Sequence, residues 1–300
     1  MKQLLVLIAL LLSLQCAAQS RIFAGRVTDK EKRGIPYAVV AIKDRNEGVY
    51  TDENGRFAFT ANADEVRAVV VSCIGYEPQE VSAELVPVND SMMITLKPKA
   101  VTMKAISVTG KKGKVREDIL GRSRKHLPHD GECYRYYGAE TAIKLAADTG
   151  HGGTLKHIFV YITGEGAFDT RFRVHVYRWG ALPGEELTDS NLVVQAKKGN
   201  SWVDVDVSRM MIPVDSGLYV SVEWISGFGN TLIPQVSQKT PEVSYNGQVP
   251  GITAGYGKPS RTYSRQPFSK EWIYYDSADA KRKGGYFLNP MIYCTYTYVD

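Results

Sequence analysis

Short apolar runs separated by polar turns fill the first third of the chain. This pattern predicts seven strands, at residues 22–27, 38–43, 49–51, 56–60, 66–73, 79–83 and 92–96. Between the third and fourth of them, Asp52-Glu53-Asn54-Gly55 has the chemistry of a tight hairpin turn, because Asn and Gly tolerate a positive φ and Asp caps the turn. So many short strands with regularly spaced turns favour a small β-sandwich.

Alternation of apolar and polar residues marks the second half of the chain. It predicts strands at residues 134–140, 155–163, 172–177, 202–207, 218–224 and 291–299. In 172–177, for example, Phe172, Val174 and Val176 share one face, while Arg173, His175 and Tyr177 share the other. Helical periodicity is nearly absent. The fold class expected is therefore all-β, with a second, larger antiparallel sandwich of the jelly-roll kind.

The first residues are typical of an export signal. Lys2 precedes an apolar core at 4–14, and small residues follow at positions 16–18. Cleavage is expected after Ala18, which leaves Gln19 as the mature end. The apolar core is too short to span a membrane, and no later run reaches about 18 apolar residues. We therefore expect an exported protein without a transmembrane segment in its mature chain, in the periplasm, on the outer membrane or secreted.

Cys16 leaves one alternative open, which is lipidation at a lipobox. Gln15, directly before this cysteine, fits that motif poorly, so plain export is favoured.

The predicted elements divide the chain into a signal peptide at 1–18, a first sandwich at 21–98, a linker at 99–130 and a second sandwich at 131–300. The formal net charge is +5, and much of it comes from the basic run at 111–125. No nucleic-acid-binding motif accompanies that run, so it is interpreted as a solvated linker, and no nucleic acid is expected as a partner.

The first sandwich carries the order G-x-V-x-D, G-x-P-x-A-x-V, T-D-x-x-G-x-F and S-x-x-G-Y. The positions that carry it are Gly25, Val27, Asp29, Gly34, Pro36, Ala38, Val40, Gly48, Thr51, Asp52, Gly55, Phe57, Ser72, Gly75 and Tyr76. This order resembles the carboxypeptidase regulatory-like domain of secreted and outer-membrane proteins of Bacteroidetes-type bacteria. The resemblance implies a prealbumin-like, Ig-like sandwich that contains neither zinc ligands nor catalytic residues.

Two weaker resemblances follow along the chain. Residues 97–110 look like the segment that joins this domain to the plug of TonB-dependent transporters, but the rest of the chain is too short for a barrel of about 22 strands. Residues 135–299 are similar to an uncharacterised β-sandwich region that follows the same domain in other Bacteroidetes secreted proteins. Neither resemblance implies a reaction.

Motifs for catalysis are incomplete. Asp148-Thr149-Gly150 matches the triplet of aspartic proteases, whose chemistry needs a second carboxylate, and the chain has no second copy. His126 and His129 lack a nearby third metal ligand, and the turn at Asp52 lacks the closing Glu of a calcium loop. No G-x-S-x-G is present. No cofactor or metal is expected, and a hydrolase is a distant alternative.

Outward-facing aromatic residues are the best indication of function. Those chosen as candidate binding residues, with one neighbouring arginine, are Tyr177, Arg173, Trp202, Tyr219, Tyr263, Trp272, Tyr274 and Tyr275. Such rings make protein interfaces, stack on sugars or cover their own domain's core. We therefore expect a non-catalytic envelope protein with a binding or scaffolding role, whose partner is an envelope protein. A glycan, bound by an accessory protein of polysaccharide uptake, is the alternative.

Cysteine usage does not indicate a disulfide framework, because cleavage after Ala18 leaves an odd number. Cys73 lies in an apolar strand and is expected to be buried. Cys133 and Cys294 lie near the two ends of the second sandwich. The sequence leaves two outcomes open for this pair, a disulfide or no disulfide.

Overall fold

The computed structural model describes residues 20–83, 91–99, 113–121, 132–133, 138–147, 152–166, 171–225, 250–257, 261–274, 281–282 and 286–300. Within them, the regular structure consists of strands and two short 3-10 turns at Ala63–Glu65 and Ser208–Met210. The all-β fold class is therefore confirmed. No helix in this part of the chain is long and apolar enough to cross a membrane. Cys16, Ala18 and Gln19 lie outside the described residues.

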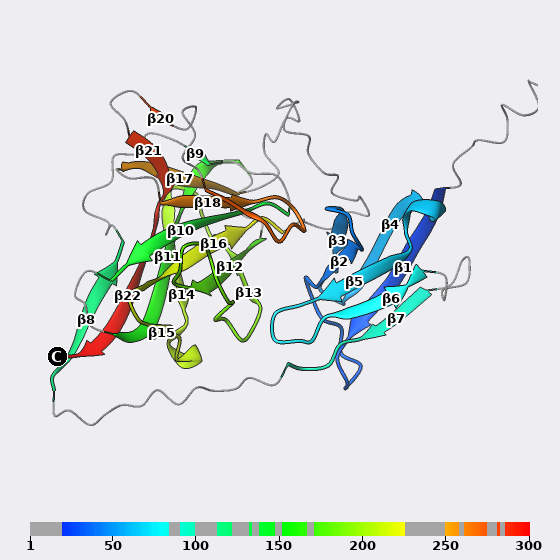
Figure 1. Cartoon of the computed structure of the whole chain (residues 1–300), viewed down its shortest axis with the longest axis horizontal. Helices are drawn as coiled ribbons and strands as arrows, with labels where there is room; N and C mark the ends of the chain where they lie inside the picture. The colour runs from blue at the N-terminus through cyan, green and yellow to red at the C-terminus, as the bar shows by residue number, and fades with distance from the viewer. Residues whose placement is uncertain are drawn as a thin grey trace, which may run out of the picture.

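The N-terminal sandwich packs two sheets face to face (Figure 1). One sheet has the strand order β4 (Arg56–Asn62), β1 (Ser20–Thr28), β7 (Ser91–Thr95), and the other has the order β3 (Gly48–Tyr50), β2 (Val39–Ile42), β5 (Ala68–Ser72), β6 (Gln79–Ser82). The core between them includes Phe23, Phe59, Val40 and Val69, all almost fully buried. This is the prealbumin-like sandwich that the sequence predicts.

The C-terminal sandwich also has two sheets. The six-stranded sheet runs in the order β13 (Leu192–Gln195), β12 (Arg171–Arg178), β16 (Gly217–Glu223), β10 (Glu140–Ala146), β18 (Thr262–Arg265), β19 (Trp272–Tyr274). The nine-stranded sheet runs in the order β20 (Lys281–Arg282), β21 (Tyr286–Pro290), β17 (Pro250–Gly257), β11 (Gly153–Gly166), β22 (Ile292–Val299), β8 (Val115–Leu120). Three short strands complete it, with β14 (Ser201–Asp206) and β15 (Pro213–Val214) beside β11, and β9 (Glu132–Cys133) beside β17.

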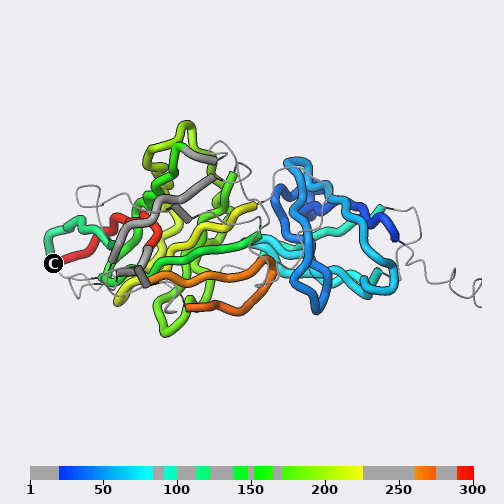
Figure 2. The backbone as a smooth tube through the Cα atoms, turned by 90° about the horizontal axis from the view of Figure 1, so that it is seen from above, coloured from blue at the N-terminus to red at the C-terminus, as the bar shows by residue number. Residues whose placement is uncertain are grey.

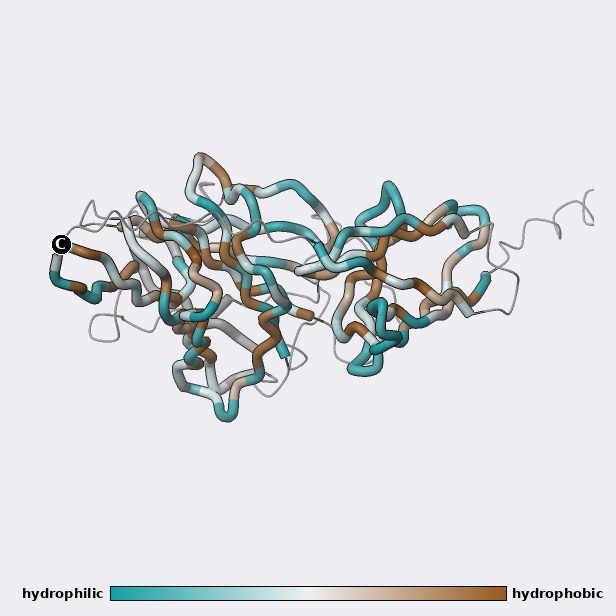
Figure 3. Tube along the Cα trace, turned by 90° about the horizontal axis from the view of Figure 1, so that it is seen from below, coloured by the Kyte–Doolittle hydropathy of each residue, from teal (hydrophilic) through white to brown (hydrophobic). Residues whose placement is uncertain are grey.

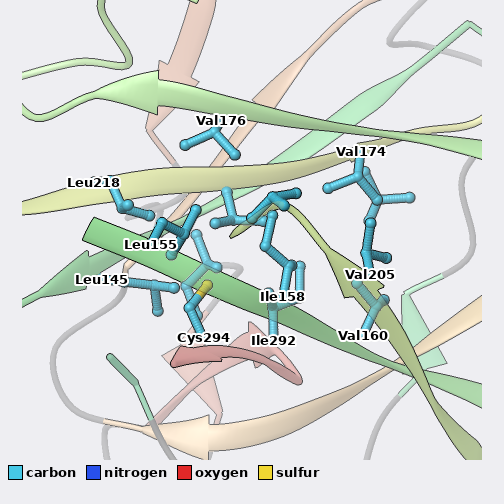
Figure 4. Packing of buried hydrophobic residues seen from close by; sticks show 14 of the residues in the cluster. Leu145, Leu155, Ile158, Val160, Val174, Val176, Val205, Leu218, Ile292 and Cys294 are labelled. Carbon is cyan, nitrogen blue, oxygen red and sulfur yellow. The ribbon is translucent and has the colours of Figure 1, made fainter. Parts of the chain in front are cut away.

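The core of this second sandwich lies between its two sheets. Val174 and Val176 of β12 and Leu218 of β16 meet Leu155 and Ile158 of β11 there, and all are fully buried (Figure 4). Apolar stretches follow the strands of both sandwiches, and polar stretches follow their turns (Figure 3). The inward faces that alternation predicted for these strands are therefore correct. An antiparallel sandwich is observed, while its jelly-roll character stays a prediction.

Two element boundaries differ from the prediction. Residues 115–120, placed in the linker, form the edge strand β8 beside β22, and Leu120 is the one side chain of β8 that is fully buried, so an alternating pattern is hard to see. Of the strand predicted at 134–140, residues 134–137 lie outside the described residues, and the described strand runs over Glu140–Ala146. This strand lies in the middle of the six-stranded sheet and is buried on both faces, which removes the alternation.

The disulfide considered between Cys133 and Cys294 is not formed, because Cys294 is a free, fully buried thiol. Cys294 lies between Ile158 of β11 and Leu120 of β8, whereas Cys133 pairs with Ile252 of β17. Strands β9 and β22 are therefore not neighbours, whereas a bridge between adjacent strands needs a Cα separation of about 4.4 to 6.8 Å. Figure 4 shows the Cys294 sulfur within the apolar cluster.

Candidate functional site: the outer face of the six-stranded sheet

The most unusual surface of the C-terminal sandwich is the face of the six-stranded sheet that points away from its own core. Strand register brings four charged residues into one row across it: Arg173 of β12, Glu223 of β16, Glu140 of β10 and Arg265 of β18. We call these four residues the charged row. Two carboxylates stand directly opposite each other at its centre, which is destabilising unless cations flank them. The row supplies one arginine on each side.

Each carboxylate of the charged row is held by several donors. Arg173 Nη1 donates to Glu223 Oε2 over 2.7 Å, and Arg265 forms an ion pair with Glu140. Glu140 also accepts hydrogen bonds from the hydroxyls of Tyr177, at 2.8 Å, and Ser221. Both glutamates are buried. Buried charges persist only when they are paired and hydrogen-bonded, and this row meets that condition.

His175 bridges the charged row to a further carboxylate. Its Nε2 lies 3.1 Å from Glu223 Oε2, and its Nδ1 lies 2.8 Å from Glu186 Oε2. Burial lowers the pKa of His175, but the charges of Glu140 and Glu186 and the hydrogen bonds to Glu186 and Glu223 outweigh it and raise the pKa from 6.5 to about 10. The imidazole is therefore charged at neutral pH and donates from both nitrogens.

The same electrostatics fix Glu223 as an anion. Burial raises the pKa of its carboxyl, but Arg173 and His175 outweigh burial and hold the pKa well below its usual range. Burial likewise disfavours a charge on Arg265, yet Glu140 raises the pKa of this guanidinium. His175, Glu223 and Arg265 thus carry permanent charges and do not exchange protons near neutral pH.

Aromatic rings continue the outer face beyond the charged row. Tyr177 meets Trp272 edge to face at 5.6 Å, Tyr219 meets Tyr263 in the same way at 5.3 Å, and Tyr263 lies 5.0 Å from Tyr274. We call these five residues the aromatic face. At one end of it, Lys144 Nζ lies 4.3 Å above the ring of Trp179. The Tyr219 hydroxyl donates to the carbonyl of Gly180 over 2.9 Å, so the loop after β12 covers this ring.

The N-terminal sandwich closes the other end of the outer face (Figure 2). Tyr50 of β3 donates its hydroxyl to Glu223 Oε1 over 2.7 Å, and Arg173 donates to the carbonyl of Tyr37. Asn191 links both sides, because it accepts from Arg173 Nε over 2.6 Å and donates to the Pro36 carbonyl over 3.2 Å. We call this contact region between the sandwiches the joint.

Six of the eight candidate binding residues lie together on this outer face. They are Arg173, Tyr177, Tyr219, Tyr263, Trp272 and Tyr274. Trp202 lies on the other sheet, edge-on to Tyr161 and Tyr293, and Tyr275 lies outside the described residues.

The predicted solvent exposure of several candidates is wrong. Tyr177 is 5% exposed, Tyr219 is fully buried, and Arg173 is buried at the joint. The reason is that a second layer, made of the loop after β12 and the N-terminal sandwich, covers the face that alternation marks as outward. Tyr274, at 41%, remains exposed. Of the seven proposed residues that the structure describes, it is therefore the clearest candidate for an external contact.

Sequence reasoning missed the residues that organise this face. Glu140, Glu186 and Arg265 are not among the residues identified from the sequence, although His175 is predicted to share the outward face of 172–177. The available signal was the polar side of strands 172–177 and 218–224, which carries Arg173, His175 and Glu223 at matching positions. Pairing them with Glu140 and Arg265 requires knowing the strand order, which alternation does not give.

The chemistry of the outer face is that of a stabilising cluster. No group of His, Cys, Asp and Glu side chains that could hold a metal ion occurs in the part of the chain that the structure describes. Asp148-Thr149-Gly150, His126 and His129 lie outside that part.

Comparison with known proteins identifies the first sandwich. Residues 23–108 match the family model of the CarboxypepD_reg-like domain. The chain is also 33% identical over 121 residues to the TonB-dependent receptor SusC of Bacteroides thetaiotaomicron, a match that covers 40% of this chain and 11% of that protein. The chain thus spans a small part of the length of the curated relative that it matches. The resemblance to a carboxypeptidase regulatory-like domain of the Bacteroidetes type is confirmed.

Proposed function

We propose that this chain, with its carboxypeptidase regulatory-like domain at residues 23–108, is a non-catalytic protein of the cell envelope that acts by binding another envelope protein. Similarity to a TonB-dependent receptor supports the location and an association with nutrient uptake. In this proposal the C-terminal sandwich makes the contact, and the N-terminal sandwich holds it in a fixed orientation.

The observation that carries the proposal is the internal neutralisation of the outer face. Glu223 is paired with Arg173 and His175, Glu140 is paired with Arg265, and Glu186 is paired with His175. A hydrolase needs a carboxylate or an imidazole that can give or take a proton next to its substrate. Glu223, Glu140, His175 and Arg173 are instead buried, and each of these groups is bonded to another of the set, which is the arrangement of a scaffold.

The contact surface that we propose is the exposed end of the aromatic face. Tyr274 lies in the edge strand β19 and is 41% exposed, and Leu182, in the loop that covers Tyr219, is 50% exposed. The two are connected through Tyr263, which packs against Tyr274 and whose hydroxyl donates to the carbonyl of Ala181 over 3.4 Å. Tyrosines held rigidly at an apolar surface are frequent contributors to protein interfaces.

A glycan ligand is the second candidate, and a different surface favours it. Trp202 packs edge-on against Tyr161 at 5.3 Å and against Tyr293 at 4.8 Å on the outer side of the nine-stranded sheet. Asp204, on the same strand, is exposed and pairs with His157 over 2.8 Å. Sugar-binding sites often combine aromatic rings, which stack on the sugar, with a carboxylate, which accepts hydrogen bonds from its hydroxyls.

One set of variants separates these functions. The whole chain would be crosslinked in envelope fractions and applied to a glycan array, alongside Tyr274→Ala with Leu182→Ser, Trp202→Ala, and the control Met93→Ser. Met93 is 68% exposed on the N-terminal sandwich. Loss of one defined crosslinked protein in the Tyr274/Leu182 variant alone supports the proposal. Glycan binding that Trp202→Ala removes supports the second candidate. Crosslinks unchanged in every variant count against the proposed surface.

A further inference from the structure

We infer that the outer face of the C-terminal sandwich is a docking surface for the N-terminal sandwich, so that the two remain bound when the chain between them is cut. This inference does not depend on what the protein binds. It concerns residues 20–99 as the docked partner and residues 113–300 as the receiving surface. Three features of the joint support it: the charged row, the backbone conformation and the complementary polar contacts at the rim.

The charged row takes some of its hydrogen-bond partners from the N-terminal sandwich. Arg173 and Glu223 are both buried, and two of their hydrogen-bond partners, the Tyr37 carbonyl and the Tyr50 hydroxyl, belong to the N-terminal sandwich. Burial and the nearby Glu223 raise the pKa of Tyr50 well above its ordinary value, so its hydroxyl stays protonated and donates. Separation of the sandwiches therefore removes specific partners from two permanent charges.

Backbone strain occurs on both sides of the joint, where two of the six described non-glycine residues with a positive φ lie. Tyr37 has a φ of 56° and Phe268 has a φ of 56°, the left-handed region that bulky residues rarely adopt. Tyr37 belongs to the N-terminal sandwich and Phe268 to the turn between β18 and β19. Both rings join the apolar cluster of Tyr37, Tyr50 and Ile225, with Val39, Val193 and Phe268 packed against it. Strained conformations persist where surrounding contacts over-determine them, and here those contacts come from both sandwiches.

At the rim of the joint, polar and charged groups of the two sandwiches are complementary. Arg171 of β12 forms an ion pair with Glu53 of the N-terminal sandwich over 2.6 Å, and its guanidinium lies 5.8 Å from the ring of Tyr37. Asn191 reaches the Pro36 carbonyl from the loop before β13. A polar rim around an apolar and charged centre is the usual layout of a specific protein interface.

The test uses the whole chain with a specific protease site inserted between residues 104 and 105. After complete cleavage, size-exclusion chromatography at about micromolar concentration is expected to show both fragments in one peak. A stable complex, whose dissociation constant lies below that concentration, does not separate on the column. Two separate, folded fragments at that concentration would overturn the inference.

Variants at the rim make the test specific. Arg171→Glu is expected to weaken the complex of cleaved fragments about fivefold, through repulsion from Glu53, and Glu53→Arg added to it should restore the affinity. The matched control exchanges the charges of Arg178 and Glu185, an exposed pair within the C-terminal sandwich, and should leave the affinity unchanged. Failure of the double variant to restore binding would contradict the docking geometry.

A variant at the centre completes the test. Tyr50→Phe keeps the ring but removes the hydrogen bond to Glu223, and is expected to weaken the complex about tenfold or more, because bonds to charged groups are the strong ones. Since the ring stays in place, the N-terminal sandwich should remain folded, which circular dichroism checks. An unchanged affinity would show that Tyr50 does not hold the sandwiches together.

Discussion

Tyr50 and Glu223 lie 2.7 Å apart across the boundary between the two sandwiches, although 173 positions separate them in the chain. The Tyr50 hydroxyl, from the edge strand β3, thereby adds a hydrogen bond to the Glu223 carboxylate, which is already paired with Arg173 and His175. This relationship makes the outer face of one sandwich part of the interior of the whole molecule.

Removing the arginine at the joint should be costly. Arg173→Ala removes one of the two ion-pair partners of the buried Glu223 and leaves it with His175 and Tyr50, and the free energy of unfolding is expected to fall by about 3 to 5 kcal/mol. Urea denaturation followed by fluorescence measures it. Arg178→Ala, which removes an exposed pair with Glu185, should change stability by less than about 1 kcal/mol. Equal effects of the two substitutions would mean that the charged row stabilises nothing.

His175 should make the protein lose stability as the medium becomes alkaline. Its folded-state pKa of about 10 lies above the unfolded value near 6.5, so its contribution is complete below the unfolded pKa and is lost as pH rises through the folded pKa. Between pH 7 and pH 10 the wild type should lose up to about 1.4 kcal/mol per pH unit more than His175→Gln. The groups that face this imidazole are Glu140, Glu186, Glu223 and Tyr177. Parallel stability curves would contradict a charged His175.

Glu223 should act at the opposite end of the pH scale. Its pKa is held below the ordinary value, so its contribution is present above about pH 4.5 and is lost as pH falls towards the folded pKa. Acid unfolding of the wild type should therefore be steeper than that of Glu223→Gln. Circular dichroism between pH 5 and pH 2 provides the measurement. A variant that unfolds as steeply as the wild type would show that Glu223 is not an anion in the folded protein.

The apolar core should be sensitive to cavities in the nine-stranded sheet. Ile158 of β11 is fully buried between the sheets, and Ile158→Ala is expected to cost about 2 to 5 kcal/mol. Ile273→Ala, at a side chain that is 43% exposed, should change stability by less than about 0.5 kcal/mol. Thermal unfolding of both variants tests the assignment. Comparable losses would place Ile273 in a core as well.

The free thiol of Cys294 gives a direct test of the missing disulfide. Burial raises the pKa of this thiol, and the side chain is fully buried, so a thiol reagent should label it in denaturant and not in the native protein. Mass spectrometry of labelled peptides reads the result, with Cys294→Ser as the control. If Cys294 stays unlabelled in denaturant and is labelled only after reduction, the disulfide is formed after all.

The sequence predicts the inward faces of the strands well, because apolar side chains that alternate along a strand must meet a core. Phe172, Val174 and Val176 are buried as predicted. Alternation fails for the opposite face, because it identifies polarity and not what covers a residue. Tyr219 has a polar hydroxyl and so suits a surface, yet the carbonyls of Gly180 and Ala181 satisfy that hydroxyl in a buried position.

The charged row shows the same limit at the level of topology. Glu140 and Arg265 are 125 positions apart, and only the order of strands β16, β10 and β18 places them next to each other. No local pattern in the sequence encodes that order. The residues at 140–146 also lack alternation, because their strand is covered on both sides.

The paired charges across the outer face constrain which substitutions this chain can accept. Loss of Arg265 would leave Glu140 without its ion-pair partner, and loss of Arg173 would leave Glu223 with His175 alone, so neutral drift at one position requires a matching change at its neighbour. Tyr50 extends that dependence into the other sandwich. The two halves of the gene are therefore expected to be inherited as one block, and an exchange of either half for a homologous one should fail unless this set of residues travels with it.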